Sequence, residues 1–344
     1  MMIKVVSKKG GIIHMKRILL IMLMLSCLFV LQPYEIQAAE YKSTELKVRG
    51  FEAQTVYSSK NKLHIIELRE EENEDDEFKY HYEFLDTIIS KNKIIRQRTI
   101  KCNSLKWKCA GFEDDRYYVV SRDDKSSNAC KTVKVYNKKA KLISSYKIRI
   151  SIKNLKGSNY NIIECRKIKN KLYYTVVARD GSKYYEYYQC YDLKKKKVLF
   201  SMEYDRHNHY TKLIGNKLYV MLENEIIEYN LKGKIINTYE LPEGNKYAVN
   251  ADNTDEFRFF DFDVNGKYIY YCIQNGVYSC DTKGSKTFEL MYDSTGDSAF
   301  WPGEKIGFNL DTFKVMKNGN FYIQLSTDGS AETSISTRYY EKLN

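Results

Sequence analysis

The stretch Asn170-Lys171-Leu172-Tyr173-Tyr174-Thr175 joins a turn to a strand-like run, and its recurrence along the chain decides the fold. Related stretches open at Asn61, Asp115, Asn216, Gly266 and Gly319, so the unit returns about every 50 residues. Asparagine, aspartate and glycine suit the turn, whereas the Tyr, Val, Ile and Leu that follow suit strands. No window of helical length carries the i, i+3, i+4 apolar spacing of an amphipathic helix, so the pattern predicts an all-β chain.

Each unit has room for four strands. In the unit around Leu218, strand-like runs occupy residues 210–213, 218–222, 226–230 and 234–241. A period of about 50 residues with four strands in each unit is typical of a propeller blade. The sequence therefore predicts a single β-propeller domain over residues 40–344 with six four-stranded blades. A seventh blade is the alternative that this rhythm leaves open.

The two ends of the domain complement each other. The last unit lacks a fourth strand because the chain ends at Asn344, whereas the first unit has a strand to spare. Residues 45–48 precede residues 54–57, which already serve as the inner strand of the first unit. We expect the segment 45–50 to close the ring by completing the final blade, which removes an open edge that would invite aggregation.

Two of the strand-like runs carry a family resemblance. Leu172-Tyr173-Tyr174-Thr175 and Tyr268-Ile269-Tyr270-Tyr271 resemble the second strands of secreted six-bladed propellers of the low-density-lipoprotein-receptor YWTD class, and exported bacterial propellers of unknown role look similar. The resemblance covers residues 41–344 in rhythm, although no unit contains a complete Tyr-Trp-Thr-Asp. It implies a ring with a central channel whose loops on one face bind proteins or glycans. None of the family's functional residues transfers to this chain.

The N-terminal segment has the pattern of a secretory signal over residues 15–39. Met15-Lys16-Arg17 is basic, residues 18–31 are apolar, and the segment ends in small residues at Ala38 and Ala39. The apolar run is shorter than the roughly 20 residues of a membrane span, so we expect cleavage there rather than an uncleaved anchor. The mature protein is therefore expected to be secreted or extracytoplasmic and associated with the cell envelope, without a membrane span.

Two further expectations concern this end of the chain. Residues 1–14 are expected to be a mis-annotated upstream extension, with translation starting at Met15. Anchoring of the protein as a lipoprotein through Cys27 is the less favoured alternative, because apolar residues continue past that cysteine.

Composition and charge limit the class of partner. The chain has 344 residues, of which 43% are hydrophobic, and this excludes intrinsic disorder. Its formal net charge is +12, and removal of residues 1–39 takes away five basic residues and one acidic residue, which leaves +8. We expect an envelope protein or glycan as the partner of a monomer, and no nucleic acid. Lys194 to Lys197 are expected in a hairpin turn, and the acidic run 70–77 in an exposed hairpin loop.

Seven cysteines remain after removal of the signal, and their spacing forms no disulfide framework. Their odd number requires at least one free thiol in a monomer. Gln274-Asn275-Gly276-Val277 has the pattern of a two-residue hairpin turn, which pairs Cys272 with Ser279. Cys272 and Cys280 would then lie on opposite faces of the hairpin, so we expect no disulfide between them.

Candidate site residues are few. Asp261, Asp263 and Asn265, closed by Gly266, match the opening of a calcium loop, but position 12 of that loop is Cys272 rather than glutamate. We favour a tight turn between two strands of a blade, with calcium as the alternative; no other cofactor is expected.

Two aromatic residues are candidates for a binding contact. Phe300 and Trp301 stand beside a turn in a polar segment, where an aromatic side chain can act as a hot spot. Packing of Trp301 between blades is the simpler alternative.

Two functions agree with these features. In the first, the protein is a non-catalytic binding or scaffold module that recognises a protein or glycan of the envelope through the loops of one face. In the second, it is an enzyme acting on a polysaccharide or peptide, a glycosidase or lyase with carboxylates converging at the channel mouth. The motifs of serine hydrolases, nucleotide-binding loops and zinc proteases are absent, so we favour the binding module.

Overall fold

A computed structural model describes residues 39–46, 55–73, 76–91, 93–102, 106–121, 129–153, 155, 159–204, 210–222, 224–242, 260–273, 276–294, 308–327 and 335–343. All of them belong to one unit, Ala38–Asn344. They form 24 β-strands, and none of these residues belongs to a helix that could cross a membrane.

The strands form six antiparallel four-stranded sheets, which we number as blades 1 to 6. Blade 1 contains β2 (Thr55–Ser59), β3 (Lys62–Asn73), β4 (Asp76–Ser90) and β5 (Lys93–Lys101). Blade 2 contains β6 (Trp107–Glu113), β7 (Arg116–Ser121), β8 (Cys130–Asn137) and β9 (Leu142–Arg149). Blade 3 contains β10 (Asn159–Ile168), β11 (Lys171–Asp180), β12 (Lys183–Asp192) and β13 (Lys197–Tyr204).

The other three blades follow the same order. Blade 4 contains β14 (Tyr210–Ile214), β15 (Lys217–Met221), β16 (Glu225–Asn230) and β17 (Ile235–Glu240). Blade 5 contains β18 (Phe260–Asn265), β19 (Tyr268–Ile273), β20 (Gly276–Asp281) and β21 (Phe288–Asp293). Blade 6 contains β22 (Phe308–Val315), β23 (Phe321–Thr327), β24 (Ile335–Lys342) and β1 (Tyr41–Glu45).

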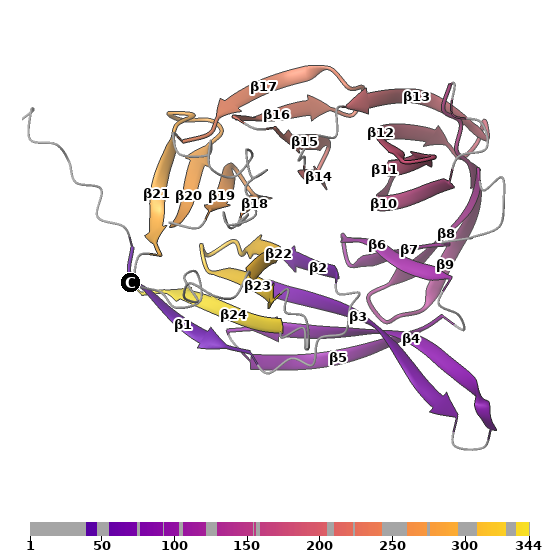
Figure 1. The fold of residues 1–344 in the computed structure, drawn as a ribbon, viewed down its shortest axis with the longest axis horizontal. Helices are drawn as coiled ribbons and strands as arrows, with labels where there is room; N and C mark the ends of the chain where they lie inside the picture. The colour runs from indigo at the N-terminus through magenta and orange to yellow at the C-terminus, as the bar shows by residue number, and fades with distance from the viewer. Residues whose placement is uncertain are drawn as a thin grey trace, which may run out of the picture. The chain divides into compact units, whose positions relative to one another are not determined.

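The blades stand in a ring, with the first strand of each nearest the centre and the fourth on the circumference (Figure 1). The chain is a six-bladed β-propeller. The predicted fold class is thus confirmed, and the seven-bladed alternative is wrong.

The hydrophobic core is divided among the interfaces between blades. Each of the six clusters of buried apolar residues draws its members from two neighbouring blades, and together the clusters run round the whole ring. Tyrosine suits these interfaces because its ring packs among the apolar side chains while its hydroxyl forms a hydrogen bond with a polar group. Tyr239, for example, is 1% exposed and donates a hydrogen bond to Glu228 Oε2 at 2.6 Å.

The N-terminal strand completes blade 6, as predicted. The closing strand is β1, Tyr41–Glu45, which lies earlier than the expected segment 45–50. Its register pairs Tyr41 with Lys342 and Glu45 with Arg338, so β1 pairs with the last strand, β24. Residues 47–50 lie outside the described residues.

Two local expectations need correction. The hairpin that carries Cys272 and Cys280 pairs Cys272 with Val277, so Gly276 lies in strand β20 rather than in the turn. A Cβ atom at Gly276 would lie 2.5 Å from the carbonyl oxygen of Tyr292. The neighbouring strand therefore approaches too closely for a residue with a side chain at this position. Cys272 and Cys280 form no disulfide with each other, as expected.

The acidic run 70–77 is the second correction. Strand β3 extends to Asn73 and β4 starts at Asp76, so most of this run is strand rather than loop. The β3–β4 hairpin projects beyond the ring in Figure 1. Lys194 to Lys196 lie in the turn between β12 and β13, as predicted, and Lys197 is the first residue of β13.

Candidate functional site

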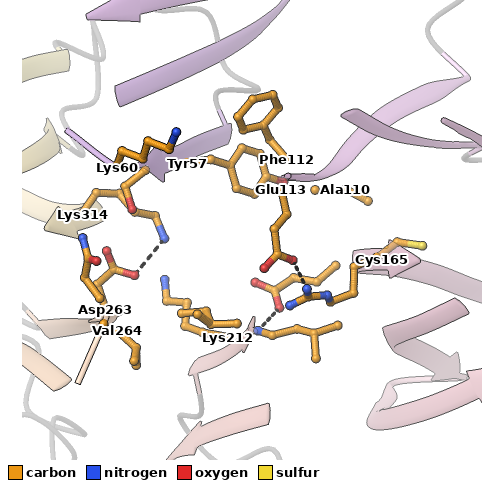
Figure 2. Close-up of a pocket in the computed structure, with 18 residues that line it drawn as sticks. Tyr57, Lys60, Ala110, Phe112, Glu113, Cys165, Lys212, Asp263, Val264 and Lys314 are labelled. Atoms are coloured by element: carbon orange, nitrogen blue, oxygen red, sulfur yellow. Dashed lines mark hydrogen bonds and ion pairs between the residues drawn. The ribbon is translucent and has the colours of Figure 1, made fainter. Parts of the chain in front are cut away.

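The inner strands of all six blades enclose a central cavity of about 210 Å³. Its walls come from the ends of the strands β2, β6, β10, β14, β18 and β22, which six distant parts of the sequence supply. Figure 2 shows the side chains of Glu113, Lys212 and Lys314 pointing toward the same space. The site is therefore polar, although the interfaces around it are apolar.

The cavity side chains occupy equivalent positions in the blades. Tyr57, Gly111, Arg166, Lys212 and Asp263 each pair with the third residue of the neighbouring second strand. The same strand geometry thus directs four different side chains and the backbone of Gly111 to one cavity, and their chemistry differs from blade to blade. In blade 6 the charged cavity side chain is Lys314, which pairs with Tyr322, the second residue of β23.

The buried Lys314 and the partly buried Lys212 face two buried aspartates. The Lys212 ammonium lies 3.2 Å from Asp261 Oδ1, and the Lys314 ammonium lies 3.5 Å from Asp263 Oδ1. Burial opposes the charge of Lys212, but Asp261 and Asp263 outweigh it and raise the pKa of Lys212. For Lys314 the effect of burial exceeds that of the nearby aspartates, so the pKa of Lys314 is lowered.

The same aspartates bind blade 5 to blade 6. Asp261 Oδ2 accepts the backbone N–H of Phe313 at 3.2 Å, and Asp263 Oδ2 accepts that of Val315 at 2.9 Å. Asn265 Nδ2 donates to the carbonyl oxygen of Val315 at 2.8 Å. Because each residue of this sequence motif contacts β22, the motif has a structural role in the interface.

The tight turn favoured for this motif is present at its end, whereas Asp261, Asp263 and Asn265 belong to strand β18. Gly266 has a φ of +65°, in the left-handed region that favours glycine, and lies between β18 and β19. No group of three or more His, Cys, Asp or Glu suited to a metal occurs within the described parts of the chain. Calcium binding by Asp261, Asp263 and Asn265 stays a prediction.

Arg166 is the cavity residue with unused donors. Its side chain is 7% exposed, and Nη2 lies 2.5 Å from Glu113 Oε2. The remaining guanidinium atoms Nε and Nη1 are buried and have no hydrogen-bond partner among the described residues. An unmet buried donor costs about 1–3 kcal/mol, so this arrangement favours an acceptor from a bound molecule.

Two glutamates line the same cavity. Glu164 Oε2 accepts the backbone N–H of Leu213 at 2.7 Å, across the interface between blades 3 and 4. Burial raises the pKa of Glu164, against the opposing charges of Lys212 and Lys314. Burial also raises the pKa of Glu113, although Arg166 opposes it.

The sequence predicted part of this site. Asp263 and Asn265 line the cavity, and Asp261 contacts Lys212 beside it. Phe300 and Trp301 lie outside the described residues. Arg166 and Lys314 were missed because each comes from a separate blade, which leaves no motif. One signal existed for Lys314, which is the single Lys or Arg of residues 308–315, whereas Arg166 stands beside Lys167.

Comparisons with known proteins bear on the fold alone. No protein-family model matches the sequence, and no curated protein matches it. Among solved structures, the β-propeller domain of the Trilobed protease from Pyrococcus furiosus is 13% identical, with a TM-score of 0.41 over 83% of this chain and 84% of that one.

Two other solved structures are similar to the same degree. The polysaccharide lyase Uly1 is 10% identical, with a TM-score of 0.43 over 85% of this chain and 77% of that one. The Pan2 WD40 domain of Neurospora crassa is 8% identical, with a TM-score of 0.40 over 91% of this chain and 98% of that one. Similarities at this level include enzymes and non-enzymes and carry no functional conclusion.

Proposed function

We propose that the protein is an exported, non-catalytic β-propeller that binds an acidic envelope ligand, with one carboxylate-bearing residue of a glycan or peptide held in the central cavity. The observation that carries the proposal is the buried guanidinium of Arg166, whose Nε and Nη1 lack partners among the described residues. The signal pattern of residues 15–39 supports export.

The chemistry of the cavity supports an acidic ligand. Among its described lining residues, the buried polar atoms without a partner are both donors, so the missing group is an acceptor. A carboxylate accepts a charge-assisted hydrogen bond from a guanidinium N–H more strongly than a neutral hydroxyl does. Lys212 and Lys314 line the same space, and each is paired with an aspartate.

The size of the cavity supports a small group. Pockets for drug-sized ligands enclose roughly 300–1,000 Å³, and this cavity encloses about 210 Å³. One sugar or one amino-acid residue is therefore the part that enters it, while the remainder of the ligand lies outside.

A hydrolytic enzyme is the second candidate, and one observation favours it. Glu113 and Glu164 line the same cavity, and burial raises the pKa of both carboxyls. Glycoside hydrolysis uses one protonated and one ionised carboxyl group. Cleavage of a bound acidic glycan, abolished by Glu164→Gln, would establish this alternative.

Binding to small acids tests the proposal. D-galacturonate and D-galactose differ at one carboxylate, and L-glutamate represents the peptide class. We expect calorimetric titration of residues 40–344 to detect galacturonate or glutamate and not galactose. Arg166→Met should weaken binding about 10- to 100-fold, because charge-assisted hydrogen bonds contribute roughly 1.5–3 kcal/mol.

Arg179→Met is the matched control, because Arg179 is exposed and does not line the cavity. Equal binding of galactose, binding by the Arg166→Met variant that equals wild type, or no binding of either acid would each refute the proposal.

A further inference from the structure

A tripeptide of lysine and two aliphatic residues opens the outermost strand of four consecutive blades. Its copies are Lys93-Ile94-Ile95, Lys141-Leu142-Ile143, Lys197-Val198-Leu199 and Lys234-Ile235-Ile236. In every copy the register shifts at the second aliphatic residue, which is the extra residue of a β-bulge. We call the aliphatic residues of these copies the bulge pairs.

The bulge pairs face solvent. Apart from Val198, which is partly buried, their members are 40 to 54% exposed. They make up seven of the nine large hydrophobic residues that are exposed within the described parts of the chain; the other two are Tyr184 and Leu343. Exposed apolar residues that are scattered singly need no explanation, but these recur at one strand position in four consecutive blades.

Positive charge accompanies the bulge pairs. The turns before the outermost strands of blades 1 to 5, residues 91–93, 138–141, 194–197, 232–234 and 283–286, contain 13 lysines and no acidic residue. We call them the lysine turns, and together with the bulge pairs they form the basic rim. In blades 2 to 5 an Asn or Asp side chain caps the turn; Asn230 Oδ1, for example, accepts the N–H groups of Lys232 and Lys234 at 2.8 and 3.1 Å.

The lysine turns lie at one end of the ring. In an antiparallel blade the first and third turns share an end, and their contacts agree: Leu193 N donates to Asn170 O at 3.0 Å, and Thr282 N donates to Lys267 O at 2.8 Å. The residues beside the first turns of blades 1, 2, 4 and 5 line the one central cavity, so these blades point the same way. The basic rim therefore surrounds one mouth of the ring.

We propose that the basic rim docks the propeller on the surface of an anionic lipid bilayer. The bulge pairs belong to β5, β9, β13 and β17, which follow one another along the circumference (Figure 1). A flat surface meets all of these positions together, whereas a globular partner meets one or two. Lysine next to exposed aliphatic side chains is the combination that binds a bilayer interface, since the charges meet the headgroups and the aliphatic groups enter the acyl boundary.

Vesicle sedimentation tests the proposal. Residues 40–344 contain every strand of the ring, and we expect this protein to sediment with phosphatidylglycerol vesicles and not with phosphatidylcholine vesicles. A variant with Ile95→Ser, Ile143→Ser, Leu199→Ser and Ile236→Ser should bind at least about tenfold more weakly, because the apolar area that leaves water is lost. The replaced side chains are exposed, so the fold is retained, as circular dichroism would verify.

Tyr184→Ser is the matched control, because Tyr184 is 45% exposed near the opposite end of blade 3. This variant should bind phosphatidylglycerol vesicles like the wild type. Substitution of Lys194 to Lys197 by glutamine should weaken binding about tenfold or more in low salt.

Three results would overturn the proposal. The first is failure to bind phosphatidylglycerol vesicles, and the second is binding that the four serines leave unchanged. The third is evidence that the basic rim binds something other than a bilayer. Such evidence would be a dimer in sedimentation velocity that the four serine substitutions dissociate, or equal affinity for soluble polyphosphate, which carries negative charge without lipid.

Discussion

At the scale of residues, the central cavity combines charges that a protein interior normally excludes. Lys212 and Lys314 are each paired with an aspartate, and those aspartates also accept backbone N–H groups of β22. Burying a charge costs several kcal/mol unless pairing and hydrogen bonds compensate it, which explains the dense network. Arg166 departs from this rule, and its unmet donors are the reason that we place the ligand beside it.

Glu164 provides a prediction about pH. Burial raises the pKa of this carboxyl in the folded protein above its ordinary value of about 4.3. The folded state then holds the proton more tightly than the unfolded state, so stability falls as pH rises from the ordinary pKa through the raised one. In Glu164→Gln this contribution is absent, and the variant should gain stability relative to wild type across that window.

Urea unfolding at a series of pH values measures this difference. The control is Glu240→Gln, since Glu240 is exposed at the end of β17. Unfolding free energies of Glu164→Gln and wild type that run parallel across the window would contradict the prediction.

At the scale of elements, turns and strands were predictable because their signals are local. A recurring turn before an apolar run, Asn-Lys or Gly-Lys in four of the six units, placed the start of each second strand. The strands of blade 4 agree with the expected ranges within a few residues. The β19–β20 register was missed because Gly276 was interpreted as a turn residue. The structure explains this glycine by its close contact with the backbone of Tyr292. The cavity was missed for a similar reason, since its residues meet only when the ring closes.

Strand β1 yields a prediction about ring closure. Leu46 N donates to Thr337 O and Leu343 N donates to Glu40 O, so the alternation of an antiparallel ladder gives Thr44 an N–H directed at β24 and Ser43 an N–H directed away from it. Proline has no backbone N–H. In an edge strand, proline therefore removes a hydrogen bond at Thr44, whose N–H points to β24, but not at Ser43.

Thr44→Pro should therefore be about 1 kcal/mol less stable than Ser43→Pro, and it should aggregate faster on heating because it frees the edge of β24. Thermal unfolding with light scattering measures both quantities. Identical melting of the two variants would mean that β1 does not close blade 6.

At the scale of the whole molecule, the ring explains why a chain of ordinary strands can build a specific site. Six apolar interfaces hold the blades together, and six inner strands bring distant residues into one cavity. The cavity and the lysine turns share one end of the ring, so the proposed ligand site and the proposed docking surface face the same direction. An acidic ligand residue carried on an anionic surface would lie at the cavity while the lysine turns contact that surface.

The crystal structure of residues 40–344 soaked in D-galacturonate tests the central claim most directly, because it locates the ligand. We predict density in the central cavity, with the sugar carboxylate about 3 Å from Nε or Nη1 of Arg166, which is hydrogen-bond distance. An empty cavity at a saturating concentration, or a sugar ordered elsewhere on the ring, would contradict the assignment of this cavity as the binding site.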